Sequence, residues 1–118
     1  MDQTDPDPTE PSHVSLLNEH REDGSWLNLD AYLDSNGTLR IVGQDLGAVA
    51  EFISSDGEYE YFYTIAAEDV PALANTLGGQ PGADILDVLA SNWSGDASYG
   101  LGRTIESSGV KYHFANYF

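Results

Sequence analysis

Alternation of apolar and polar residues marks five segments of the chain as β-strands, because successive side chains of a strand point to opposite faces. These segments are residues 13–20, 26–33, 38–43, 58–65 and 110–118, and the first has the weakest pattern. The alternation is clearest in residues 58–65. One face of this strand would carry Tyr59, Tyr61, Tyr63 and Ile65, and the opposite face would carry Glu58, Glu60, Phe62 and Thr64. The pattern therefore predicts a sheet of about four to five strands.

Turn residues separate these segments. Asn36-Gly37 lies between the second and third strands and predicts a tight hairpin, because both residues tolerate positive φ. Residues 44–47 are expected to interrupt the third strand. The short apolar segment 48–53 that follows fits either a helix or a strand.

The apolar period lengthens to that of a helix after residue 65. Val70, Leu73, Ala74 and Leu77 follow the spacing i, i+3, i+4, i+7, and Gly78-Gly79 ends this helix. A second helix is predicted after Pro81-Gly82, with an apolar face of Ile85, Leu86, Val88, Leu89 and Trp93. A third carries Leu101 and Ile105, with Asp96 or Ser98 as its cap. The fold class is thus α+β, a mainly antiparallel sheet with two to three helices packed on one face.

The domain is expected to cover residues 13–118. Residues 1–12 alternate proline with acidic residues and predict a disordered leader. This leader has neither the positive charge nor the apolar run of a secretory signal, and no segment reaches the ~18 apolar residues of a membrane span. We therefore expect a cytoplasmic protein.

Net charge narrows the range of partners. Twenty acidic residues oppose four basic ones, which gives a formal charge of −16. Because four acids and no base lie in residues 1–12, the rest of the chain carries −12. Such a surface repels nucleic acid and anionic membranes and attracts basic proteins. The alternative is that the charge serves only solubility.

The sequence contains no motif that predicts a catalytic residue, a cofactor or a metal. It has no cysteine, and its three histidines lack the spacing of a helical metal pair. Glu58 and Glu60 are neighbouring carboxylates on one strand face. Such a pair can share a proton or hold a cation, remain as a solvated face, or dock on a basic partner.

Aromatic residues are abundant, with seven tyrosines and two tryptophans. Tyrosine suits interfaces because its body is apolar and its tip is polar. We expect Tyr61 and Phe114 in the core and the terminal Tyr117-Phe118 pair on the surface. The candidate partner-binding residues are Asp45, Glu58, Tyr59, Glu60, Tyr117 and Phe118.

Three segments carry a resemblance to other proteins: residues 43–47 (GQDLG), residues 58–61 (EYEY), and Asp69-Val70-Pro71 with Leu77-Gly78-Gly79. Through them the chain resembles small, uncharacterised acidic proteins of high-GC actinobacteria. In length, charge and lack of cysteine it is also similar to immunity proteins of bacterial toxin systems. We expect a non-enzymatic binding protein of this immunity or inhibitor type, because the folded part carries −12 and acidic residues alternate with aromatic ones from Glu58 to Tyr63. Such a protein would act by covering the active surface of a basic partner.

Two alternatives stay open. One is a small-ligand-binding or enzymatic domain that uses Glu58, Glu60 or Asp45 around a pocket beside the tyrosines. The other is a housekeeping domain whose acidity serves only solubility. The sequence does not indicate an oligomeric state.

Overall fold

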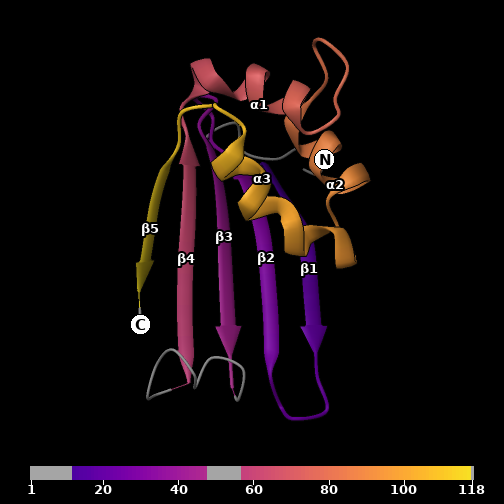
Figure 1. Ribbon diagram of the computed structural model, residues 1–118, viewed down its shortest axis with the longest axis vertical. Coiled ribbons are helices and arrows are strands. Elements are labelled where there is room, and N and C mark those ends of the chain that lie inside the picture. Colours follow the sequence, from indigo (N-terminus) through magenta and orange to yellow (C-terminus); the bar gives the residue numbers. More distant parts are fainter. Residues whose placement is uncertain (1–11, 48–56, 118) are drawn as a thin grey trace, which may run out of the picture.

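The computed structural model describes residues 12–47 and 57–117 as an antiparallel sheet with helices on one of its faces. The strands lie in chain order: β1 (Ser12–His20), β2 (Trp26–Leu33), β3 (Leu39–Leu46), β4 (Glu58–Ile65) and β5 (His113–Tyr117). The helices lie between β4 and β5 in sequence: η2 (Ala67–Asp69), α1 (Val70–Thr76), α2 (Ile85–Asn92), η3 (Gly95–Gly100) and α3 (Leu101–Ser107). Figure 1 shows them across the upper half of the sheet. The predicted α+β class is confirmed.

Two strands have the predicted bounds, and three differ from prediction. The third was predicted to end at residue 43, but β3 continues to Leu46 because residues 44–46 pair with both β2 and β4. The turn then follows at Gly47, whose φ is 89°. β5 is shorter than predicted, whereas β1 begins one residue early, at Ser12, which pairs with Leu33. The predicted leader up to residue 11 and the apolar segment 48–53 lie outside the described residues.

The hairpin between β2 and β3 occurs where Asn36-Gly37 predicted it. The Gly37 amide donates to the Asp34 carbonyl and the Asp34 amide donates to the Thr38 carbonyl, both at 2.9 Å. Only the glycine has positive φ, at 91°. Asn36 instead accepts a hydrogen bond from the Thr38 amide through its side chain, at 3.1 Å. Asn36 therefore stabilises the turn through its side chain and not through positive φ.

The helices begin at residues with identifiable roles. α1 has its proline in the first turn, as predicted, and α2 starts after Asp84, whose carboxylate accepts a hydrogen bond from the Asp87 amide. The predicted caps of the third helix were wrong, because Ser98 donates its hydroxyl to the Gly95 carbonyl at 2.6 Å and Asp96 caps nothing.

None of the helices within the described ranges has the length and apolar character that a bilayer crossing requires.

The core lies between the helices and the upper half of the sheet. Its fully buried side chains come from both layers: Ala31, Leu39, Ile41 and Ile65 from the strands, and Leu73, Leu89, Leu101 and Ile105 from the helices. Tyr63 joins this core at 5% exposure, and Tyr61 packs against it while half-buried. Phe114 was predicted in the core but is 39% exposed, because β5 is an edge strand beyond the helices.

Candidate functional site

The predicted site residues divide between the two faces of the sheet. Glu58, Glu60 and Tyr117 project from the face without helices, which we call the open face. Asp45 and Tyr59 lie opposite each other on the face that carries the helices. Phe118 lies outside the described residues. The structure therefore does not bring the predicted residues into a single site.

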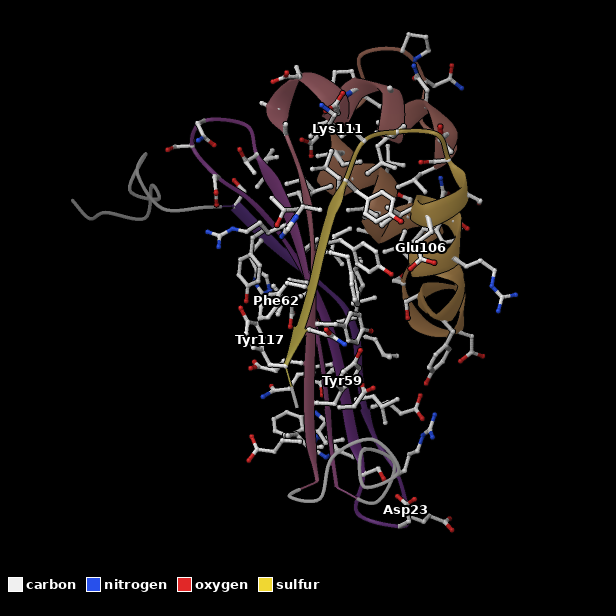
Figure 2. The ribbon with its side chains drawn as sticks, turned by 60° about the vertical axis from the view of Figure 1, so that its left-hand side comes forward. Asp23, Tyr59, Phe62, Glu106, Lys111 and Tyr117 are labelled. Carbon is white, nitrogen blue, oxygen red and sulfur yellow. The ribbon has the colours of Figure 1, made fainter. Side chains whose placement is uncertain are left out.

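Cross-strand pairing assembles the open face in rows. One row runs Asn18, Asn28, Gln44, Glu60 and Tyr117, and the next runs Ser15, Asp30, Val42, Phe62 and Ala115. The rings of Phe62 and Tyr117 meet edge to face, with centroids 5.6 Å apart. Figure 2 shows both rings on the side of the sheet away from Glu106, which belongs to α3. An aromatic contact thus lies beside the Glu60 carboxylate.

The part of the open face over β1 and β2, away from Tyr117, also carries aromatic and polar side chains. His13 stacks on Tyr32 with centroids 4.6 Å apart, and its Nε2 lies 2.9 Å from an Asp30 carboxylate oxygen. His20 stacks on Trp26 at 4.8 Å. Trp26 remains 36% exposed and Tyr117 is 61% exposed. Large aromatic surfaces therefore face solvent over β2 and over the edge strand β5.

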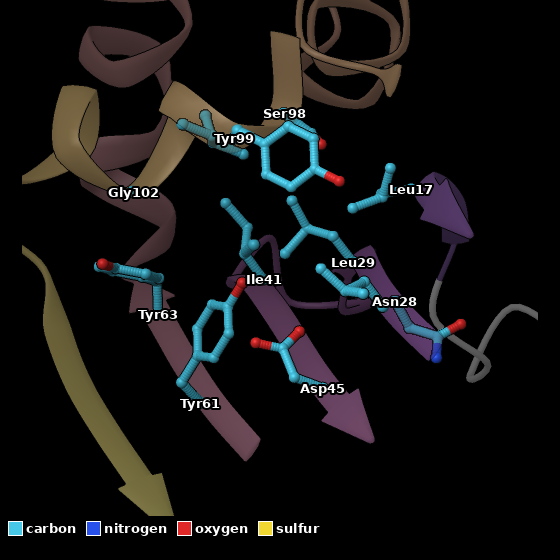
Figure 3. A pocket seen from close by; sticks show the side chains of 12 residues that line it. Leu17, Asn28, Leu29, Ile41, Asp45, Tyr61, Tyr63, Ser98, Tyr99 and Gly102 are labelled. Carbon is cyan, nitrogen blue, oxygen red and sulfur yellow. The ribbon is translucent and has the colours of Figure 1, made fainter. Parts of the chain in front are cut away.

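A cavity of about 200 Å³ lies on the opposite side, between the sheet and the η3–α3 segment, and we call it the tyrosine pocket (Figure 3). Its apolar lining includes Leu17, Leu27, Leu29, Ile41 and Leu101. Its polar residues include Asp45, Tyr61 and Tyr99, together with Asn28, Tyr63 and Ser98. The pocket adjoins the core, because Leu29, Ile41 and Leu101 belong to both.

Two glycines determine the shape of the tyrosine pocket. A Cβ atom on Gly43 would lie 2.0 Å from Cζ of Tyr61, so this ring lies directly over the bare β3 backbone. A Cβ atom on Gly102 would lie 2.8 Å from the Tyr63 hydroxyl, so α3 also approaches the sheet closely. Tyr63 in turn donates a hydrogen bond to Oε2 of Glu106 on α3, at 2.6 Å. The pocket wall is therefore held by steric fit on one side and by a hydrogen bond on the other.

The polar groups of the pocket are partly desolvated. Burial raises the pKa of Asp45, and the positive charge of Arg21 opposes this effect. Burial also raises the pKa of Tyr61 to about 12, with a further contribution from the Asp45 charge. Within the described residues, none donates a hydrogen bond to the Asp45 carboxylate and none accepts one from the Tyr61 hydroxyl. Both groups therefore keep hydrogen-bonding capacity toward the cavity.

A hydrogen-bonded triad stands at the mouth of the pocket. Arg21 donates from Nε to Oε2 of Glu19 at 2.7 Å and from Nη2 to the Tyr99 hydroxyl at 3.2 Å. Tyr99 donates to Oε1 of Glu19 at 2.7 Å. The Arg21 hydrogen bond, followed by that of Tyr99, lowers the pKa of Glu19. The triad joins the β1–β2 hairpin to η3 and fixes the Tyr99 ring over the cavity.

Sequence reasoning missed most of this pocket. Tyr99 meets Glu19 across 80 positions, and no local pattern signals such a contact. Gly43 did carry a signal, because glycine inside a strand marks a close approach of another group. Tyr59 was identified, and it accepts a hydrogen bond from Nδ2 of Asn116 at 3.3 Å on the pocket side.

The arrangement does not assemble a carboxylate or metal centre. Glu58 and Glu60 lie on the open face and Asp45 on the other, so these three carboxylates do not converge. Across residues 12–47 and 57–117, no three His, Cys, Asp or Glu side chains come together as metal ligands. No match to this chain was found among protein-family models, curated proteins or solved structures.

Proposed function

We propose that this protein is a non-enzymatic binding protein that docks a basic partner protein on its open face, in the manner of an immunity or inhibitor protein. The observation that carries the proposal is the contact between Phe62 and Tyr117 beside Glu60 on a face that no described helix covers. An aromatic centre next to carboxylates matches the anatomy of protein interfaces, where aromatic anchors lie within a polar rim.

The backbone beneath these residues is suited to recognition. Glu60 and Phe62 project from β4 and Asp30 projects from β2, and both strands are paired on both sides, so these side chains project from a rigid surface. Tyr117 projects from the edge strand β5 beside them. A rigid surface loses little conformational entropy when a partner binds. Glu60 and Asp30 then offer carboxylates that an arginine or lysine of the partner can reach.

Acidic residues elsewhere have a different role in this proposal. They lie on the β1–β2 hairpin (Glu22 and Asp23), beyond the upper end of the sheet (Glu68), and on α2 (Asp87), rather than in one patch. A charge spread in this way attracts a basic protein from any direction and speeds its encounter. The aromatic residues of the open face then determine where the partner docks.

The test compares variants of the open face with a variant of equal charge elsewhere. Basic proteins captured from the native host would be identified, and their affinities measured for Glu60→Lys, Tyr117→Ala and the control Glu68→Lys. We expect the two open-face variants to lose at least about tenfold in affinity, as truncation at an interface anchor does. Glu68→Lys should slow association by a few-fold, with little effect on dissociation.

Two results would contradict the proposal. One is that no basic protein is captured at low or moderate salt. The other is that Glu60→Lys and Tyr117→Ala bind as tightly as Glu68→Lys, which would leave the charge as a contribution to solubility.

A further inference from the structure

The geometry points to a second binding site: the tyrosine pocket takes a small organic cation, a primary amine on a compact apolar body. This site lies on the helix side of the sheet and does not depend on the docking of a protein partner. Three features favour such a ligand: the size of the cavity, the placement of one carboxylate, and the engagement of the nearby Arg21 with other groups, with no hydrogen bond from any described residue to the Asp45 carboxylate.

The size of the pocket selects a compact ligand. Its volume of about 200 Å³ compares with the ~150 Å³ in which an apolar cavity binds benzene. Leu29 and Ile41 of the sheet and Leu101 of α3 give it apolar walls. A body of one ring with a short chain therefore fills it.

The polar end of the pocket selects a hydrogen-bond donor with positive charge. Asp45 and Tyr61 reach into the cavity from neighbouring strands (Figure 3). An ammonium group can donate to the carboxylate and also contact the electron-rich face of the Tyr61 ring. An anionic ligand would face the same carboxylate and be repelled.

Arg21 does not occupy the position that we propose for the ammonium group of the ligand. It donates to both Glu19 and Tyr99, so its guanidinium is held at the mouth of the pocket against a carboxylate of its own. Its charge reaches Asp45 only through space. The Asp45 carboxylate therefore stays available to a ligand.

The two proposed sites can be tested independently. Asp45 and Tyr61 point to the helix side, whereas Glu60 and Phe62, which neighbour Tyr61 in sequence, point to the open face. A substitution at Asp45 leaves the open face intact, and a substitution at Glu60 leaves the pocket intact. Failure of one proposal does not imply failure of the other.

The experiment titrates the intact chain with 2-phenylethylamine and follows backbone amide resonances. The matched neutral probe is 2-phenylethanol, which has the same ring and chain but no charge. We expect shifts at pocket residues such as Leu29 and Gly102, and at least about tenfold weaker binding of the alcohol, because a hydrogen bond to a charged group is lost. Asp45→Asn should weaken amine binding to a similar degree, and Glu60→Gln should change it less than twofold.

Three results would overturn the inference. Equal binding of amine and alcohol to the wild-type chain would show a purely apolar pocket. Shifts confined to the open face would show that the amine binds there. No saturable shift at millimolar amine would show that the cavity takes no such ligand. The comparison of probes uses only wild-type protein, so it does not depend on the Asp45→Asn variant.

Discussion

Replacement of Gly43 by alanine should disrupt the wall of the tyrosine pocket. The added Cβ atom would lie 2.0 Å from Cζ of Tyr61, where ordinary contact begins at 3.4 Å. Because the backbone of β3 is paired on both sides, the Tyr61 ring is the part that must move, by about 1.4 Å. It would then leave its place between Tyr59 and Tyr63, whose ring centroids lie 5.6 and 6.4 Å from its own.

The change in the free energy of unfolding caused by Gly43→Ala is the balance of two opposing effects. Overpacking of a fitted site costs about 1–3 kcal/mol. Alanine in a strand is favoured over glycine by about 0.5–1 kcal/mol. Because the 2.0 Å separation is far inside ordinary contact, the overpacking cost falls in the upper part of its range, at about 2–3 kcal/mol. We therefore expect Gly43→Ala to lower the free energy of unfolding by about 1–2.5 kcal/mol in the wild-type background. With Tyr61→Ala the clash is removed, so the same substitution should become neutral or stabilising.

The assay is urea unfolding of the four proteins of this double-mutant cycle, followed by tryptophan fluorescence. The coupling between the two positions isolates the contact between the ring and the backbone from the loss of the tyrosine itself. A Gly43→Ala variant as stable as wild type would refute the reasoning. So would an equal loss of stability in the Tyr61→Ala background, because the ring would then not be the obstacle.

Two further predictions concern single groups. Tyr63→Phe should lower the free energy of unfolding by about 1 kcal/mol, because it removes the hydrogen bond to Glu106. Denaturant unfolding measures this loss, with Tyr112→Phe as the control. Equal losses of stability in the two variants would contradict the prediction. Asp45→Asn should be stabilising at pH 7. Burial raises the pKa of Asp45 in the folded state, so the folded chain holds this proton more tightly than the unfolded chain does. The folded state of the wild-type protein therefore loses stability as pH rises through the window between the ordinary aspartate pKa and the raised pKa of the folded state. The advantage of the variant should vanish below that window, and an advantage constant from pH 3 to 7 would contradict this account.

The elements of the fold were predictable because their signals are local. Alternation fixed the bounds of residues 26–33 and 58–65, and glycine pairs and proline indicated where α1 begins and ends. Errors arose where pairing with other strands decides the outcome. Gln44 and Asp45 have low strand propensity, yet neighbours on both sides keep β3 extended to Leu46.

The candidate sites were predictable only in part. Asp45, Tyr59 and Glu60 could be selected from residue type and spacing, but the sequence did not show that Asp45 and Glu60 face opposite sides. That assignment depends on which face the helices cover, which tertiary packing decides. The triad of Glu19, Arg21 and Tyr99 depends on placement of η3 above the β1–β2 hairpin, and it has no counterpart in sequence spacing.

The order of the strands has a consequence for how the chain folds. Each of the first four strands pairs with its neighbour along the chain, so these hairpins can form from nearby residues at low loop-closure entropy. β5 joins β4 only after the whole helical segment has been made, and it completes the edge that bears Tyr117. During synthesis the proposed docking face would therefore form only after β5 has been made, which would delay partner capture until the helical segment has been translated.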